Sequence, residues 1–222
     1  MKKANRHSPK KASTHTIESL TEISIELFMK RGYEATSVEE IAQAAGITKS
    51  AIYYHVKSKE ELLHRAISSA VSNLFKILEE AAARGGAPVH RLEFIIRRLI
   101  ETEVDYLKEI ALLLRVRGTT RTETWALKQR REFDRQVRAL IGEAQSAGEI
   151  RNDIDALAID RLIFGMLTWI PEWYYKGHAI APDVLVEAAV ALIFDGLRRP
   201  IAALRKTAKT ARDRNGASPR DI

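Results

Sequence analysis

The stretch IAQAAGITKSAIYYHVKSKEEL, residues 41–62, contains two short helical segments separated by a glycine. Ile41 and Ala42 begin the inner face of the first segment, and Gly46 supplies the left-handed backbone that ends a helix. Thr48 then caps a second segment of about two turns. Two short helices joined by a glycine turn and packed on a preceding helix form a helix-turn-helix unit, whose second helix lies in the DNA major groove.

The second segment contains three large side chains in a row, Tyr53, Tyr54 and His55, which cannot all face the core. Ile52 and Val56 are its expected inward residues. The others suit a nucleic acid, because ammonium and hydroxyl groups donate to base edges and phosphates, and aromatic rings lie against thymine methyls and sugars. From this stretch, the predicted DNA-binding residues are Thr48, Lys49, Ser50, Tyr53, Tyr54, His55 and Lys59. The alternative is that the tyrosines and the histidine straddle a seam between helices.

The net charge of +7 on this chain of 222 residues is concentrated at its two ends. Residues 1–15 contain five basic residues and no acidic one, and residues 200–222 contain six basic and two acidic residues. Neither segment has apolar periodicity, so we expect a basic disordered arm and a basic disordered tail, which hold a polyanion only loosely. The rest of the chain is slightly negative.

Several classes of protein are excluded by what the sequence lacks. It contains no cysteine, which rules out thiolate metal sites and disulfides and favours a reducing, cytoplasmic location. The longest uncharged run in the strongly apolar region, residues 162–171, is far below the roughly 18 residues of a membrane span. No phosphate loop or hydrolase motif is present. We therefore expect a protein that is not an enzyme and that uses no cofactor and no metal.

Helical periodicity covers almost everything between the two ends, and no alternating strand pattern competes with it. Thr36 with Glu39, or Ser37 with Glu40, fits a capping box. Beyond residue 57, the expected helices span about 58–84, 89–117, 122–147, 155–175 with a kink at Pro171, and 182–198. The prediction is an all-α fold of about nine helices. A three-helix helix-turn-helix domain at residues 16–63 precedes a larger ligand-binding and dimerisation bundle at residues 64–199.

From Thr16 to Leu63 the chain resembles the DNA-binding domain of the TetR family of bacterial transcriptional regulators, through LFMKRGYEATSVEEIAQAAGITKSAIYYHVKSKEELL. The resemblance implies a dimer that represses transcription from a palindromic operator, and a small-molecule inducer held by the C-terminal domain. It assigns phosphate contacts to Thr36, Tyr54 and Lys59. The base or near-base contacts that it assigns are Lys49, Ser50, Tyr53 and His55. A non-specific nucleic-acid binder acting through the basic ends is the alternative.

The last two expected helices, about 155–175 and 182–198, are apolar on every side. A helix that is apolar all round is buried all round. In a chain of this length, the second buried side most simply faces a second copy, so we expect a homodimer through these helices. A monomer that buries both helices centrally is the alternative.

A ligand site is suggested by aromatic and apolar residues around Pro171: Phe164, Met166, Trp169, Trp173 and Tyr174. Such residues also commonly form core. Residues 168–197 resemble the end of a TetR branch with acyl-CoA inducers, but Tyr175 and Lys176 replace the usual proline and arginine. If the ligand is an acyl-CoA, its phosphates need cations. The candidates are Arg115, Arg117 and Arg121, near Trp125. The alternative for the arginines is that they lie on the solvated surface. The alternative for the ligand is an aromatic or drug-like molecule.

Overall fold

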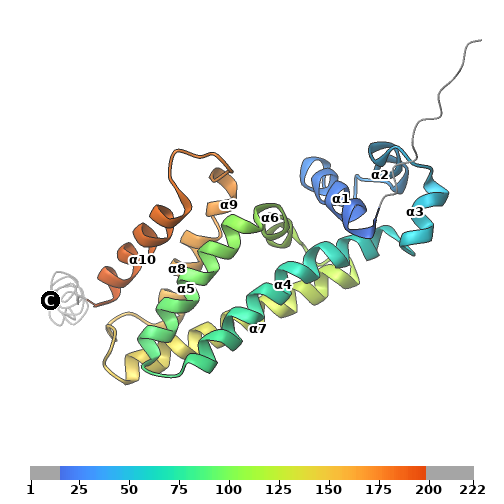
Figure 1. Ribbon diagram of the computed structural model, residues 1–222. Helices are drawn as coiled ribbons and strands as arrows, with labels where there is room; N and C mark the ends of the chain where they lie inside the picture. Colours follow the sequence, from blue (N-terminus) through green and yellow to red (C-terminus); the bar gives the residue numbers. More distant parts are fainter. Residues whose placement is uncertain (1–15, 199–222) are drawn as a thin grey trace, which may run out of the picture. The chain divides into compact units, whose positions relative to one another are not determined.

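The computed structural model describes residues 16–198, and all regular structure in this range is α-helical. Nine helices have seven residues or more, and α9 has four, which confirms the predicted all-α fold. The helices in Figure 1 are α1 (Ile17–Arg31), α2 (Val38–Ala45), α3 (Lys49–His55), α4 (Lys59–Arg84), α5 (Pro88–Asp105), α6 (Leu107–Arg115), α7 (Arg121–Ser146), α8 (Ala156–Leu167), α9 (Ile170–Trp173) and α10 (Pro182–Arg198). The predicted basic arm and basic tail lie outside the described residues.

The described chain forms two compact units. The first comprises residues 16–71 and 108–127, and the second comprises residues 72–107 and 128–198. This division differs from the expected boundary after residue 63, because α6 and the start of α7 group with the helix-turn-helix. Two contacts within the first unit fix this grouping: Lys108 donates to Glu26 at 2.7 Å, and the backbone N–H of Thr122 donates to Glu60 at 3.0 Å.

Capping residues define the first three helices. The Ser37 hydroxyl accepts from the backbone N–H of Glu40 at 3.2 Å, and the Glu40 carboxylate accepts from the backbone N–H of Ser37 at 2.8 Å. The capping box of α2 is therefore Ser37 with Glu40, the second of the two predicted pairs. Gly46 ends α2 with a φ of 68°, a conformation that costs a residue with a Cβ more than it costs glycine.

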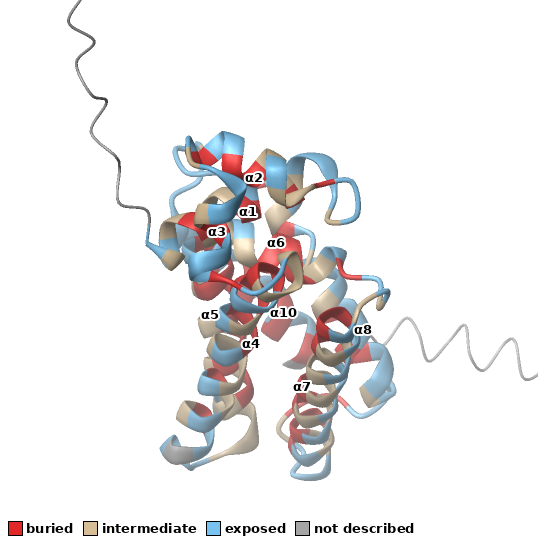
Figure 2. Cartoon of the chain, turned by 90° about the vertical axis from the view of Figure 1, so that its right-hand side faces the viewer, coloured by how far each residue is buried: buried red, intermediate tan, exposed pale blue. Residues whose placement is uncertain are grey.

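The second unit has a core centred on Phe133 of α7, which is 2% exposed. Its ring meets Phe75 of α4 and Phe164 of α8 edge to face, at centroid distances of 6.2 and 6.0 Å. Helix α5 packs against α10 in the same unit. Figure 2 shows buried and exposed residues alternating along the long helices, as amphipathic helices require. No helix between residues 16 and 198 is long and apolar enough to cross a bilayer.

Two of the expected helices are interrupted. The helix predicted over 89–117 breaks at Tyr106, whose φ of −120° and ψ of 42° leave the helical region. The prediction of one kinked helix over 155–175 is also wrong, because there are two helices: α8 ends at Leu167, and Pro171 lies in the first turn of α9. Proline is tolerated there, since the first N–H groups of a helix have no partner within it.

Arg151 joins the end of α10 to the segment before α8. Its side chain is 3% exposed and forms two bonds with the carboxylate of Asp153, at 2.7 and 2.8 Å. The same guanidinium donates to the carbonyl oxygen of Gly196 at 3.2 Å, and the backbone N–H of Arg151 donates to the carbonyl oxygen of Leu197 at 2.9 Å. Arg151 therefore holds three groups, the Asp153 carboxylate and the carbonyl groups of Gly196 and Leu197, from two separate chain segments.

Candidate functional site

The two helices of the helix-turn-helix share a closed apolar interior. Ile41 and Ile52 are fully buried, and Ala42, Ala45 and Val56 are at most 6% exposed. The N–H of Gly46 and that of Ile47 donate back to the end of α2, which fixes the turn. The register of α3 is therefore set by its inward residues, as the sequence predicts.

The opposite face of α3 is open to solvent. Tyr54 is 90% exposed and Tyr53 is 47% exposed. The other exposed residues of this face are Thr48, Lys49, Ser50 and His55. The Thr48 oxygen accepts from the backbone N–H of Ala51 at 3.2 Å, so it caps the helix and keeps its own hydrogen free to donate. The structure thus brings six of the predicted DNA-binding residues onto one face.

Lys49 is not isolated on this face, since its ammonium forms an ion pair with Glu39 of α2. That hydrogen bond raises the pKa of Lys49 and lowers the pKa of Glu39. Both side chains are about half exposed, so water and competing anions reach the pair easily. The pair positions the ammonium at the start of α3 without burying it.

Thr36 and Lys59 are placed differently from the expectation that their side chains contact phosphate. Thr36 is 1% exposed, and its hydroxyl donates to the carbonyl oxygen of Gly32 at 2.8 Å. The ammonium of Lys59 donates to the carbonyl oxygen of Tyr33 at 2.8 Å and lies 4.2 Å from the centre of the Tyr33 ring. Both side chains brace the turn between α1 and α2 in this structure, and their contact with phosphate stays a prediction.

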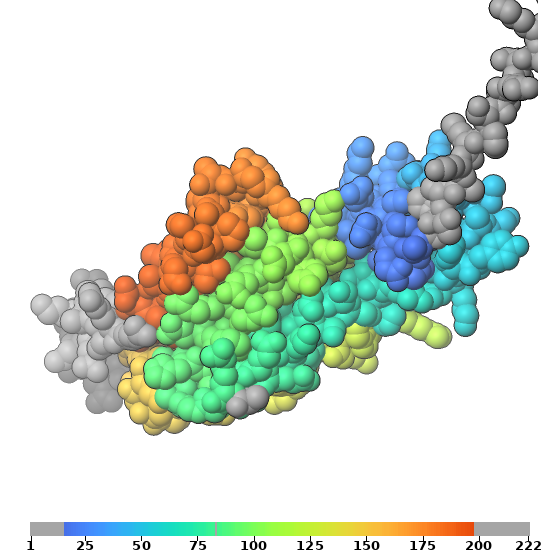
Figure 3. Space-filling model, in the orientation of Figure 1, coloured from blue at the N-terminus to red at the C-terminus, as the bar shows by residue number. Residues whose placement is uncertain are grey.

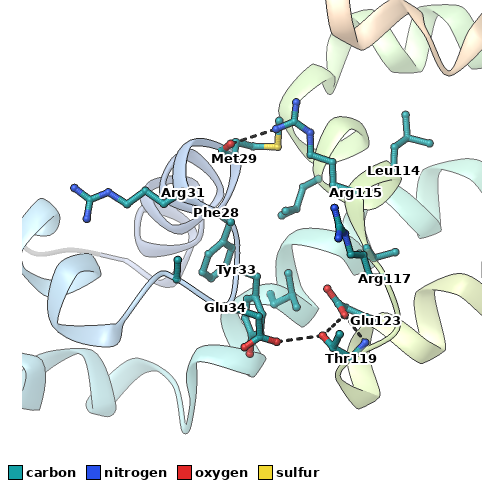
Figure 4. A pocket seen from close by; sticks show the side chains of 15 residues that line it. Phe28, Met29, Arg31, Tyr33, Glu34, Leu114, Arg115, Arg117, Thr119 and Glu123 are labelled. Carbon is teal, nitrogen blue, oxygen red and sulfur yellow. Dashed lines mark hydrogen bonds between the residues drawn. The ribbon is translucent and has the colours of Figure 1, made fainter.

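The first unit also contains a cavity of about 710 Å³ (Figure 4). Its lining includes Arg115 and Arg117 of the predicted ligand set, but neither Arg121 nor Trp125. Trp125 instead packs against His64, at a centroid distance of 5.0 Å. The arginine cluster predicted from sequence is therefore only partly assembled.

Sequence reasoning missed five polar residues of this cavity: Arg31, Tyr33, Glu34, Thr119 and Glu123. The backbone N–H of Glu123 donates to the Thr120 hydroxyl at 3.1 Å, and its carboxylate accepts from the backbone N–H of Thr119 at 2.7 Å. The Thr-x-x-Glu spacing of residues 120–123 is a helix-start signal in the sequence. This spacing, read from the sequence, would have located the turn before α7.

The predicted aromatic cluster is in the second unit and is divided between core and surface. Phe164 and Tyr174 pack inward, and the Tyr174 hydroxyl donates to the carbonyl oxygen of Ile180 at 3.1 Å. Met166, Trp169 and Trp173 are 45%, 64% and 36% exposed. The arginines and the aromatic residues belong to different units, so neither unit by itself forms the single pocket that the sequence suggested.

The fold and this site define a helix-turn-helix DNA-binding protein of the bacterial regulator class. Residues 20–66 match the description "Bacterial regulatory proteins, tetR family", and residues 85–197 match "Tetracyclin repressor-like, C-terminal domain". The chain belongs to the TetR family of transcriptional regulators.

Relatives match along most of the chain. SCO3833, a TetR-family regulator from Streptomyces coelicolor A3, is 45% identical with a TM-score of 0.77, over 84% of this chain and 94% of that one. The transcriptional repressor KstR2 of Rhodococcus jostii RHA1 is 26% identical over 184 residues, 82% of this chain and 90% of its own. AibR, solved in complex with isovaleryl coenzyme A and operator DNA, shares the fold at 22% identity, with a TM-score of 0.68 over 79% and 96% of the two chains.

Proposed function

We propose that this regulator is a repressor that binds a palindromic operator as a homodimer and is released by a hydrophobic, anionic inducer such as an acyl-CoA. The observation that carries the DNA-binding half is the solvent-exposed face of α3, with Tyr54 at 90% exposure beside Tyr53, His55, Lys49 and Ser50. Adjacent exposed aromatic side chains mark an interaction surface, and here they follow a helix start that Thr48 caps and Lys49 makes cationic.

Within this proposal, the side chains of α3 have distinct roles. Lys49 and Ser50 lie in the first turn of α3, where recognition helices meet base edges. Lys49 gives up its exposed ion pair with Glu39 and donates to a guanine instead. Tyr53 and His55 offer flat apolar faces to thymine methyls or sugars. The hydroxyl of Tyr54 donates to a phosphate.

A homodimer explains the exposed apolar residues on α8 and α10. On α8, Leu162 is 69% exposed, and Met166 follows one turn later at 45%; Trp169, which precedes α9, is 64% exposed. On α10, Val184 and Leu192 are 55% and 70% exposed. Figure 3 shows that the segment from α9 to α10 lies at the surface of its unit. Pairing these helices with a second copy buries the apolar rows and gives the dimer two α3 helices, as an operator with two half-sites about 34–36 Å apart requires.

The inducer class is supported by chemistry and by a relative. Arg115 and Arg117 offer guanidinium groups suited to phosphate or carboxylate oxygens. The structure of AibR contains isovaleryl coenzyme A, an acyl-CoA. Not every relative represses, since FasR of Mycolicibacterium smegmatis is named an activator, so a reporter assay decides the sign of regulation.

The test is operator selection followed by affinity measurement. Sequences selected from random duplex DNA by the full chain should contain an inverted repeat. Lys49→Ala should weaken binding by about tenfold and relax the preference at one base pair of each half-site. Tyr54→Phe should weaken binding to all sequences, and the matched control Tyr175→Phe, another exposed tyrosine, should not.

A non-specific binder gives the opposite pattern. Its selected sequences share no motif, and its affinity survives Lys49→Ala and Tyr54→Phe but is lost when residues 1–15 and 199–222 are removed. That result would overturn the proposal.

A further inference from the structure

Two acidic residues follow each other in the first turn of α2, and the structure gives them different contacts. The Glu40 carboxylate accepts from the backbone N–H of Ser37 at 2.8 Å and forms an ion pair with Arg31 of α1. Glu40 thus completes the capping box of α2. The Glu39 carboxylate instead pairs with Lys49 of α3. The helix dipole favours a carboxylate at this end of α2 but does not direct it toward α3.

This ion pair brings the Glu39 carboxylate to the exposed face of α3. Helix α2 packs against α3 (Figure 1), and Lys49 is the first residue of α3, one turn before Tyr53. Two groups in contact are separated by no more than about one base-pair step, which is about 3.4 Å along DNA. A base edge that the Lys49 ammonium reaches, or the base edge next to it, is therefore within reach of the carboxylate as well.

The pair is open to solvent and is easily exchanged for other partners. The side chains of Lys49 and Glu39 are 49% and 58% exposed, and exposed ion pairs contribute little stability. The hydrogen bond from Lys49, and after it the backbone at the start of α2, lowers the pKa of Glu39. The carboxylate is therefore charged at neutral pH. Once it has lost Lys49 it needs a new donor, because the phosphates along the groove repel it.

The major groove offers such a donor on one base in particular. Cytosine presents only the donor N4 amino group there, whereas guanine presents two acceptors and thymine presents an acceptor and a methyl group. Adenine places the acceptor N7 beside its donor N6, and this acceptor repels a carboxylate. A carboxylate can only accept. Cytosine is therefore the base that an ionised glutamate fits.

We infer that Glu39 is a second base-reading residue of the helix-turn-helix, which exchanges Lys49 for the N4 amino group of a cytosine when the regulator binds its operator. The inference rests on the proposed function and deepens it by adding a residue of α2 to the surface that reads sequence. Lys49 and Glu39 then read the guanine and the cytosine of one base pair or of two adjacent base pairs. On DNA without this cytosine the carboxylate faces acceptors and phosphates, so Glu39 also weakens binding to wrong sequences.

The experiment repeats the operator selection with the full chain carrying Glu39→Ala or Glu39→Gln, beside the unaltered protein. The unaltered protein should select cytosine at one position of each half-site. Glu39→Ala should lower this preference about tenfold. Glu39→Gln should change the preferred base to adenine, because an amide accepts from N6 and donates to N7. A glutamate that only orients Lys49 would not change the identity of a selected base in this way.

Two control variants separate base reading from charge and from stability. Glu22→Gln, at an exposed position on α1, removes the same charge and should leave every base preference unchanged. Glu40→Ala removes the capping box and should lower the midpoint of thermal unfolding without changing the selected bases. The two Glu39 variants should unfold at the same temperature as the unaltered protein, since this side chain is exposed.

The outcomes distinguish this inference from the proposed function. An inverted repeat without a preferred cytosine, or with the same cytosine preference in Glu39→Ala, overturns the inference and leaves the operator-binding regulator intact. An equal change of preference in Glu22→Gln also overturns the inference, because it would assign the effect to net charge. A selection with the unaltered protein that yields no motif overturns the proposed function, and the inference with it.

Discussion

The ammonium of Lys59 donates to the backbone carbonyl oxygen of Tyr33 at 2.8 Å, and the same ammonium lies 4.2 Å from the centre of the Tyr33 ring. One cation therefore connects the first residue of α4 with the turn between α1 and α2, 26 positions earlier in the chain. The turn contains no regular structure of its own, so its position depends on contacts of this kind.

Lys59→Met keeps most of the aliphatic stem and removes the charge. We expect the free energy of unfolding to fall by about 1–2 kcal/mol, since a charge-assisted hydrogen bond and a cation–π contact are lost. The matched control is Lys57→Met, at an exposed position two residues earlier, which should change stability by less than about 0.5 kcal/mol. Urea unfolding measures both. Equal effects would show that the contact with Tyr33 contributes nothing.

Two arginine–carboxylate pairs in the second unit differ in burial and predict different losses of stability. Arg151 is 3% exposed and bonds Asp153 and the Gly196 carbonyl oxygen, whereas Arg135 is 60% exposed and bonds Glu132. Arg151→Met should cost about 2–4 kcal/mol, because Asp153 and a helix-end carbonyl lose their partner. Arg135→Met should leave the free energy of unfolding nearly unchanged. Similar losses for both variants would contradict this reading of burial.

Glu103 gives the protein a predictable dependence on pH. The residue is 6% exposed, and one carboxylate oxygen is buried without a hydrogen-bond partner in residues 16–198. Burial raises the pKa of Glu103 well above its usual 4.5. Above pH 4.5 the unfolded chain releases this proton while the folded chain keeps it, so stability falls by up to about 1.4 kcal/mol per pH unit until the folded pKa is reached.

Glu103→Gln removes this penalty. The variant should match the unaltered protein near pH 4 and exceed it in free energy of unfolding at pH 7. Glu79→Gln, at an exposed position on α4, should give a curve parallel to that of the unaltered protein. A constant difference between Glu103→Gln and the unaltered protein across this pH range would rule out titration of Glu103 as the cause.

The proposed dimer makes a prediction about mass. Leu162→Glu on α8, or Leu192→Glu on α10, places a charge in the middle of the apolar rows and should yield a monomer of 25.0 kDa in analytical ultracentrifugation. Tyr106→Glu, which is also at an exposed apolar residue of the second unit, should leave the dimer intact. A monomeric unaltered protein, or dimers that survive both leucine changes, would exclude this interface.

The elements that the sequence predicts well are those whose signals are local. Periodicity places Ile41, Ile52 and Val56 inside, and the capping pair Ser37 with Glu40 locates the start of α2. Pro171 shows the limit of such signals. The same residue kinks a continuing helix or begins a new one, and packing of the preceding residues decides which.

The contacts that the sequence does not predict are long-range. Thr36 has the residue type of a phosphate ligand, but its burial depends on how α1 meets the turn after it. The grouping of residues 108–127 with the helix-turn-helix depends on pairs such as Thr119 with Glu34, 85 positions apart. No spacing rule links such distant residues.

The packing of His64 on Trp125 gives the first unit an optical probe of its own. The chain has three tryptophans, and the other two, Trp169 and Trp173, are in the second unit. A protein that carries Trp169→Phe and Trp173→Phe would emit from Trp125 alone, and its fluorescence would report any rearrangement of α4 against α7 within this unit, without an added dye.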